Sequence, residues 1–231
     1  MQILTGTSGY SYKEWKGPFY PEDLPASKFL EYYATRLPAV EINNTFYRMP
    51  RPEVLGKWAD QTGTDFRFVL KASRRITHFK RLKEVEEQTM YLLQTASELG
   101  ERLGAVFFQL PPNFKQDIER LNTFLDFLPD PSRVAFEFRH ESWFDEATYD
   151  CLRTHGTALC VADTEEKDGE LVKTGSWGYM RLRKPGYSEA ALEDWAARIA
   201  DQGWEHAYVF FKHEDAGAGP KLAERFLQMV S

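Results

Sequence analysis

Residues 133–144 read RVAFEFRHESWF, and the first half of this stretch has the composition of a buried β-strand. In an extended chain Val134 and Phe136 share one face, whereas Glu137 and Arg139 share the other. A strand this apolar that ends in a carboxylate and a guanidinium has two explanations. The two charges form a surface ion pair, or they belong to a site at the end of a strand. The rest of the chain helps to distinguish these explanations.

Seven similar apolar runs occur along the chain. Each run is short and rich in Val, Ile, Phe and Tyr, which is typical of strands rather than helices. Together with 133–138 they give eight predicted strands. The other seven runs are residues 2–6, 39–43, 66–71, 105–110, 157–162, 178–182 and 207–212.

Stretches with helical spacing of apolar residues lie between most of these strands. For example, Ile118, Leu121 and Leu125 fall on one helical face, and Gly156 is a typical residue just after a helix. Only the connection over 163–176 lacks a helical pattern. The predicted helices are 27–37, 51–62, 84–103, 117–128, 144–156, 188–203 and 219–230.

This order of strands and helices predicts the fold class. Alternating strands and helices indicate parallel strands joined by crossover connections. Eight such units predict an α/β fold, a (β/α)8 TIM-like barrel whose sixth helix is short or missing. An open doubly wound sheet is the alternative, and it loses support because no Gly-x-Gly-x-x-Gly follows the first strand. Since no linker or low-complexity tract divides the chain, we expect one TIM-barrel-like domain over 1–231.

The composition is that of an ordinary globular protein, with 42% hydrophobic and 28% charged residues. A net charge of -6 argues against a protein whose whole surface binds nucleic acid, although not against a local basic cleft. We expect Cys151 and Cys160 to be buried, reduced thiols. No signal peptide pattern is present, and no apolar run reaches the roughly 20 residues that span a bilayer. We therefore expect a cytoplasmic protein without a membrane partner.

Polar residues stand at the ends of nearly all predicted strands. In a TIM barrel the carboxyl ends of the strands form one rim, where active sites lie. If Glu41 and Glu137 point inward they must be paired, because an isolated buried charge is costly. Such pairing shifts pKa values in the way that proton transfer requires; the alternative is a salt-bridge lattice that only supports the barrel. The strand-end residues are Glu41, Asn43, Lys71, Gln109, Glu137, Arg139, Asp163, Arg181, Arg183, Lys212 and His213.

Three loops add candidate residues. The loop after the first strand is rich in glycine and in aromatic residues such as Tyr10 and Trp15, which would wall a ligand pocket or pack as core. The basic loop 73–83 contains His78 and either attracts phosphate or is a solvated face. Glycines before the last predicted helix would let its amide groups bind an anion, or they form a plain connection.

Five stretches of the chain form an ordered set of motifs that covers nearly its whole length. They are GTSGYSYKEWKGPFYP (6–21), VEINNTFYRMP (40–50), FVLKAS with ITHFKRL (68–82), FFQLPPNF (107–114) and FEFRHESWF (136–144). In this order they resemble the domain of unknown function family 72. The resemblance implies a TIM-barrel-like fold and no established activity, and a similarity to metal-dependent endonuclease barrels is an analogy of fold only.

The positions that match this family pattern lie mainly at the predicted strand ends. Two places depart from it, because Arg183 and Lys184 stand where many relatives carry His-Gly, and Lys212 and His213 stand where many carry Asn-Asn. The matching residues are Gly9, Tyr10, Trp15, Tyr20, Glu41, Asn43, Phe46, Tyr47, Lys71, Thr77, His78, Gln109, Glu137, Arg139 and Trp143, and Asp163 and Arg181 fit the pattern less closely.

We predict an enzyme that acts by acid–base chemistry on an anionic small molecule, bearing phosphate or carboxylate. Hydrolase, lyase and isomerase are the classes that fit best. The predicted catalytic residues are Glu137, Glu41, Lys71, His78 and Asp163. The predicted ligand-binding residues are Tyr10, Trp15, Tyr20, Asn43, Tyr47, Gln109, Arg139, Trp143, Arg181, Arg183 and Lys212.

Two other functions stay open. The first is a nucleic-acid enzyme or binding protein, because aromatic residues beside Lys and Arg suit stacking and phosphate contacts. One divalent metal on Glu41, Glu137 and Asp163 would serve such an enzyme, whereas five histidines are too few for a His-rich trinuclear site. No other cofactor is evident. The second alternative is a non-catalytic ligand sensor.

Overall fold

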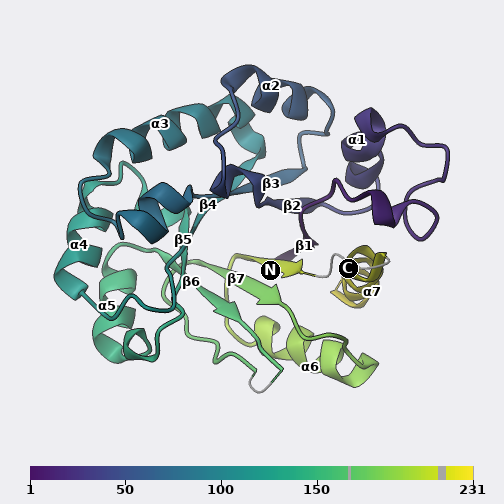
Figure 1. Cartoon of the computed structure of the whole chain (residues 1–231). Coiled ribbons are helices and arrows are strands. Elements are labelled where there is room, and N and C mark those ends of the chain that lie inside the picture. Colours follow the sequence, from purple (N-terminus) through teal and green to yellow (C-terminus); the bar gives the residue numbers. More distant parts are fainter. Residues whose placement is uncertain (166–167, 213–216, 231) are drawn as a thin grey trace.

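Eight parallel strands form a closed barrel in the computed structural model, which describes residues 1–165, 168–212 and 217–230. Each strand pairs with the next in sequence, and β8 pairs with β1 (Figure 1). The predicted (β/α)8 fold is therefore confirmed. The strands are β1 (Gln2–Ser8), β2 (Ala39–Ile42), β3 (Arg67–Lys71), β4 (Leu103–Gln109), β5 (Val134–Glu137), β6 (Ala158–Ala162), β7 (Trp177–Leu182) and β8 (His206–Phe211).

Helices surround this barrel, as Figure 1 shows. Their apolar faces pack on the strands; on α4, for example, Leu121, Phe124 and Leu125 are buried. Side-chain caps begin α5 at Asp145 and α6 at Ser188. The α-helices in the described residues are α1 (Phe29–Ala34), α2 (Pro52–Asp60), α3 (Glu86–Ala96), α4 (Ile118–Phe127), α5 (Glu146–Thr154), α6 (Glu189–Ala200) and α7 (Ala218–Val230).

The crossing from β6 to β7 carries no helix in its described residues, as predicted. Figure 1 shows it as a loop at the lower side of the barrel. The Thr174 hydroxyl ties this loop to β6, because it donates to the Thr157 carbonyl at 2.8 Å and accepts from the Leu159 amide at 2.9 Å. These two hydrogen bonds anchor the end of the loop to the start of β6.

The helix predicted over 84–103 is shorter than its sequence pattern indicates. It ends at Ala96 and is followed by tighter turns (η5, Ser97–Arg102), within which Gly100 has a φ of 55°. That left-handed conformation is open to glycine and stops the helix. The helix predicted over 27–37 is also shorter, since α1 runs from Phe29 to Ala34 and its N-cap residue, Lys28, makes no side-chain cap hydrogen bond.

The loop from β3 to α3 has an unusual backbone. It opens with a π-helical turn (η4, Arg75–Phe79). Three further residues, Arg81, Leu82 and Glu84, have φ between 50° and 66°, a region that non-glycine residues rarely adopt. Both features are more frequent at functional sites than elsewhere. This loop lies at the carboxyl end of β3, on the rim where the sequence predicts a site.

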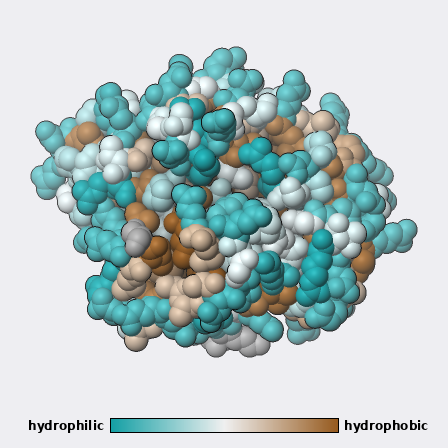
Figure 2. All heavy atoms as spheres, turned by 180° about the vertical axis from the view of Figure 1, so that it is seen from behind, coloured by the Kyte–Doolittle hydropathy of each residue, from teal (hydrophilic) through white to brown (hydrophobic). Residues whose placement is uncertain are grey.

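Apolar side chains fill both the barrel and the space between strands and helices. The cluster inside the barrel includes Phe107, Cys160, Tyr179 and Phe210. Cys151 and Cys160 are both buried and free. No helix in the described part of the chain is long and apolar enough to cross a membrane. Figure 2, seen from behind, shows a mainly hydrophilic surface with a few apolar patches.

Candidate functional site

A buried arginine joins two carboxylates across the barrel mouth. Arg181 on β7 contacts Glu41 on β2, with Nε 2.9 Å from Oε2 and Nη2 2.9 Å from Oε1. Its Nη1 donates to Oε2 of Glu137 on β5 at 2.7 Å. All three side chains are almost fully buried. Residues from three separate strands therefore meet at one point, as the alternation along each strand predicts.

Neighbouring strands complete this arrangement. The Tyr179 hydroxyl donates to Oε2 of Glu41 at 2.6 Å. The Lys71 ammonium donates to Oε1 of Gln109 at 3.0 Å, and Nε2 of Gln109 donates to Oε1 of Glu137 at 2.8 Å. Register supports these contacts, because Gln109 pairs directly with Glu137. We call this set of six residues the mouth network: Glu41, Lys71, Gln109, Glu137, Tyr179 and Arg181.

Both carboxylates of the mouth network are held ionised. Burial opposes ionisation of Glu41, but Arg181, the Tyr179 hydrogen bond and Lys71 outweigh it and lower its pKa. Burial likewise opposes ionisation of Glu137, and Arg181 and Arg183 together lower its pKa. A carboxylate whose pKa is lowered is a weak base. The two glutamates are thus better suited to fixing nearby cations than to taking up protons.

Lys71 is the group of the mouth network that titrates nearest to neutral pH. Burial and the positive charge of Arg181 lower its pKa to about 8, against the opposing effect of Glu41 and Glu137. Its ammonium lies 4.4 Å from the centroid of the Phe46 ring, which keeps water from this side. An amine with a pKa near 8 exchanges protons readily at physiological pH.

His78 lies beside Lys71 on the strained loop. Burial, with the positive charges of Lys71 and Arg139, lowers its pKa to about 4. Its imidazole is therefore neutral at pH 7. Its Nδ1 is 2.9 Å from the Thr77 hydroxyl, and its ring meets Phe46 edge to face at 4.9 Å. A neutral imidazole held in this way can accept or donate a proton through its other nitrogen.

A pocket of about 590 Å³ opens beside Glu137. We call it the rim pocket. Arg139 and Arg183 bring positive charge to it, and Phe138, Phe144 and Tyr149 supply apolar walls. Asp168 and Glu170 add negative charge at its lining. Its size falls in the usual range for small-molecule sites, and the two guanidinium groups suit a carboxylate or phosphate.

Asp163 lies next to this pocket but is already bonded. It is buried, it accepts hydrogen bonds from the Arg183 amide and the Tyr187 hydroxyl, and its carbonyl accepts one from Arg183 Nε at 3.3 Å. Burial raises the pKa of Asp163, against the effect of the Tyr187 and Arg183 hydrogen bonds. These contacts hold the Arg183 side chain so that it points toward Glu137. Arg183 Nη1 lies 3.7 Å from Oε1 of Glu137.

Several predicted ligand-binding aromatics pack in the interior instead. Trp15, Tyr20 and Trp143 are fully buried. Tyr20 stacks on Phe29 with ring centroids 4.1 Å apart, and Nε1 of Trp143 donates to the Phe114 carbonyl at 2.7 Å. Core packing accounts for these three side chains. Trp15 and Tyr20 therefore pack as core, which is one of the two interpretations that the sequence leaves open for their loop.

The remaining predicted residues lie at intermediate depth or outside. Tyr10 is half-buried against the core, and Asn43 donates to Oε1 of Glu41 at 3.1 Å. Tyr47 and Lys212 are exposed. His213, predicted at the end of the eighth strand, lies outside the described residues.

The carboxylates that were predicted to hold a metal are arranged around an arginine. Arg181 occupies the space between Glu41 and Glu137, and Asp163 is engaged by Arg183 and Tyr187. Within residues 1–165, 168–212 and 217–230, no three His, Cys, Asp or Glu side chains gather in a way that could hold an ion.

Sequence reasoning missed two kinds of contributor. Tyr179 lies two residues before Arg181 on the same face of β7, so the alternation that indicated Arg181 also indicates Tyr179. Phe107 supports the network from β4, with its ring centroid 4.9 Å from Cζ of Arg181. No sequence signal marks such a ring as a partner of a cation, because most strand phenylalanines are plain core.

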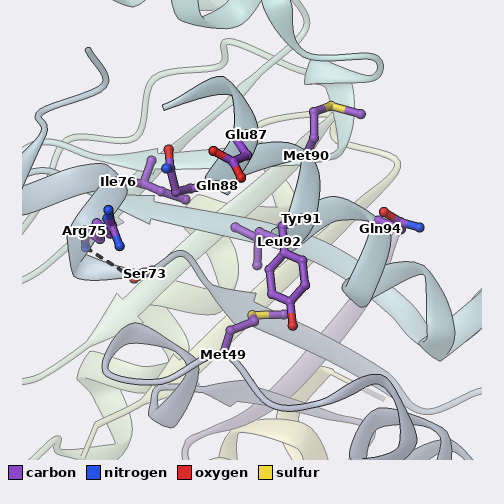
Figure 3. Close-up of a pocket in the computed structure, with 10 residues that line it drawn as sticks. All are labelled: Met49, Ser73, Arg75, Ile76, Glu87, Gln88, Met90, Tyr91, Leu92 and Gln94. Carbon is purple, nitrogen blue, oxygen red and sulfur yellow. Dashed lines mark hydrogen bonds between the residues drawn. The ribbon is translucent and has the colours of Figure 1, made fainter. Parts of the chain in front are cut away.

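A second pocket, of about 670 Å³, lies outside the barrel and is shown in Figure 3. Ser73, Arg75 and Ile76 from the loop after β3 line one side, and α3 residues including Tyr91 line the other. Met49 from the loop after β2 completes it. We call it the α3 pocket. It does not include any residue of the mouth network.

Comparisons with known proteins agree with this architecture. The chain is 37% identical to the UPF0759 protein YecE of Escherichia coli over 116 residues, which is 50% of this chain and 43% of that protein's length. It is 24% identical to the UPF0759 protein YunF of Bacillus subtilis over 99% of this chain and 94% of that protein. The chain thus spans less than half of the E. coli relative in that match.

A solved structure has the same fold over the whole chain. The crystal structure of a DUF72 family protein from Thermotoga maritima superposes with a TM-score of 0.88 at 29% identity, covering 100% of this chain and 99% of that one. The model of the family described as "Protein of unknown function DUF72" matches residues 4–231. With a match over nearly its full length, this chain belongs to the DUF72 family.

Proposed function

We propose that the protein is an enzyme that transfers protons on an anionic small molecule bound at the carboxyl rim of the barrel. The observation that carries this proposal is the convergence of Glu41, Lys71, Glu137 and Arg181 from four strands, next to a pocket lined by two further arginines. A barrel needs no buried ionic network for stability, because apolar residues of similar volume serve as well or better.

In this proposal the charged groups have different tasks. Arg139 and Arg183 bind the carboxylate or phosphate of the substrate in the rim pocket. Lys71 is the proton-transfer group, because its pKa of about 8 is near the working pH. Neutral His78, close to both Lys71 and Arg139, passes a proton between Lys71 and the substrate. Glu41 and Glu137 hold Arg181 and keep the Lys71 amine in place.

The anion-binding part can be tested before the substrate is known. We expect a panel of phosphorylated and carboxylated metabolites to contain compounds that raise the melting temperature of the protein. For such a compound, Arg139→Gln and Arg183→Gln should each weaken binding by about ten-fold or more, since a charge-assisted hydrogen bond is lost. Isothermal titration calorimetry measures this change.

Arg153→Gln is the matched control, because Arg153 is exposed and pairs only with Glu146 and Asp150 on its own helix among the described ion pairs. It should bind the compound as the unaltered protein does. If both pocket variants also bind it normally, the rim pocket is not the anion site and the proposal fails. Once a reactive compound is found, Lys71→Met should abolish turnover while binding persists.

A further inference from the structure

Two exposed aromatic rings flank an arginine on the outer part of the rim. Tyr47 follows β2 and is 68% exposed, and Phe79 follows β3 and is 69% exposed. Cζ of Arg74 lies 5.4 Å from the Tyr47 ring centroid and 5.3 Å from that of Phe79. We call these three residues the aromatic–arginine ridge. Two exposed rings gathered around one cation form a local patch, and exposed apolar patches with a polar rim mark interaction sites.

The two loops that carry the ridge are strongly basic. Residues 43–51 and 72–85 contain seven Lys or Arg and a single acidic residue, Glu84, in a chain whose net charge is -6. Among the described ion pairs, only Lys80 of these seven has an acidic partner, Glu84 at 3.8 Å. Six of the seven side chains are exposed. They are Arg48, Arg51, Arg74, Arg75, Lys80 and Lys83.

Unpaired cations around exposed rings match one kind of ligand chemistry. Flat bases stack on the rings, and the phosphates between the bases meet the cations. Only bases outside a duplex offer their faces to a protein ring, because inside a duplex the neighbouring base pairs cover these faces. The α3 pocket adjoins this surface, since Met49, Ser73 and Arg75 belong to the same two loops (Figure 3). A strand that crosses the ridge thus reaches a hollow with room for an unstacked base.

We propose that the aromatic–arginine ridge binds single-stranded nucleic acid. The ridge is built from the outer parts of the loops after β2 and β3, whereas the mouth network is built from the strands themselves. His78 lies on the same loop as Arg74 and Phe79 but is not part of the ridge. A binding assay needs no substrate of the proposed enzyme, so either proposal can fail without the other. The ridge reads no sequence, because every base has a face that stacks and the cations meet only phosphate.

Fluorescence anisotropy with a labelled oligothymidine tests the proposal, at several salt concentrations. The strand should exceed the about 4–16 nucleotides of a typical single-strand site. Tyr47→Ala and Phe79→Ala should each weaken binding by about ten-fold, and Tyr47→Phe and Phe79→Trp should restore it, because stacking needs a ring. Arg74→Gln should lower the slope of log affinity against log salt by about one. Arg153→Gln, whose charge lies outside the ridge, should change neither value.

Three further probes distinguish binding of a single strand from binding of any polyanion, of a duplex or of a membrane surface. Heparin has negative charge without bases, a matched duplex has its bases covered, and phosphatidylserine vesicles offer a charged membrane surface. Weaker binding of all three than of the single strand supports the proposal. Equal or tighter binding of any of them, or an unchanged affinity of Tyr47→Ala and Phe79→Ala for oligothymidine, overturns it. Since these side chains are exposed, the variants should fold, and circular dichroism checks that they do.

Discussion

At the scale of single residues, Arg181 is the central cation of the mouth network. It is the cation that both Glu41 and Glu137 contact directly. Its planar guanidinium makes these contacts at once, whereas an ammonium group offers a single charged point. Tyr179, a neutral donor because burial and Glu41 raise its pKa far above the usual value, cannot replace that charge.

We therefore expect Arg181→Met to lower the free energy of unfolding by about 3–5 kcal/mol at pH 7, because it leaves two buried carboxylates with too little positive charge. Urea denaturation measures the change. Arg153→Met, at an exposed position, should change it by less than about 1 kcal/mol. If Arg181→Met lowers the free energy of unfolding as little as the control does, then water or Lys71 compensates the negative charge of the two carboxylates.

Replacement of Lys71 is expected to stabilise the protein at pH 7, whereas replacement of Arg181 destabilises it. Its pKa in the folded protein is about 8, below the usual 10.5. Between these two pH values the unfolded chain binds more protons than the folded one, so the Lys71 contribution to stability rises with pH. Below pH 8 the lysine is charged in both states and its burial is unfavourable. Lys71→Met should thus stabilise the protein at pH 7, by about 1–3 kcal/mol.

Urea denaturation of the Lys71→Met variant and the unaltered protein at pH 7 and pH 9.5 checks this prediction. The difference in unfolding free energy between the two proteins should shrink as the pH rises. Destabilisation at both pH values would show that Lys71 is part of a structural lattice, the alternative that the sequence leaves open. If the removal of this buried lysine stabilises the protein, the lysine is kept for function at the expense of stability.

At the scale of single elements, the sequence predicted strands better than loops. The eight predicted strands agree with the observed ones to within two residues at each end. Alternation along them also predicted that Glu41, Lys71, Glu137 and Arg181 would meet, because a period of two fixes which side faces inward. The alternation of side chains is fixed within each strand, and it is kept when the strands assemble into the barrel.

Loop positions were harder to predict, because their surroundings come from distant parts of the chain. Trp15 and Trp143 have the composition of ligand contacts, yet both are buried in the core. Tyr47 is predicted as a ligand contact and is exposed, and Phe79, for which the sequence predicts no role, is exposed as well. Nothing within either loop distinguishes these outcomes. The helix break at Gly100 was missed for a related reason, since a glycine inside a helical pattern is often tolerated.

At the scale of the whole molecule, the barrel wall is not uniform. β1 and β8 pair from Gln2↔His206 to Thr7↔Phe211, whereas β5 and β6 pair only at Ala135↔Ala158 and Phe136↔Leu159. β6 also lacks a covering helix in the described residues of its crossing to β7. Few ladder bonds and little cover make local opening easier.

Hydrogen exchange followed by mass spectrometry should show this difference. The amides of β6 should exchange faster than those of β8, by about ten-fold or more, because an opening that costs 1.4 kcal/mol less is ten times more frequent. Binding of an anion in the rim pocket, which contacts β5 and β6, should slow exchange in β6. Equal protection of β6 and β8 would mean that the barrel opens only as a whole.

The position of Arg181 in the chain has a consequence for biosynthesis. A ribosome delivers the carboxylates of residues 41 and 137 well before it delivers residue 181, so an incomplete nascent chain holds their negative charges without the guanidinium that joins them. Packing the first six strands into a half-made cylinder would bury that excess charge, which is costly. The cylinder is therefore expected to close only after the seventh strand has left the exit tunnel, and shortened chains that stop before it should remain open and sensitive to proteases.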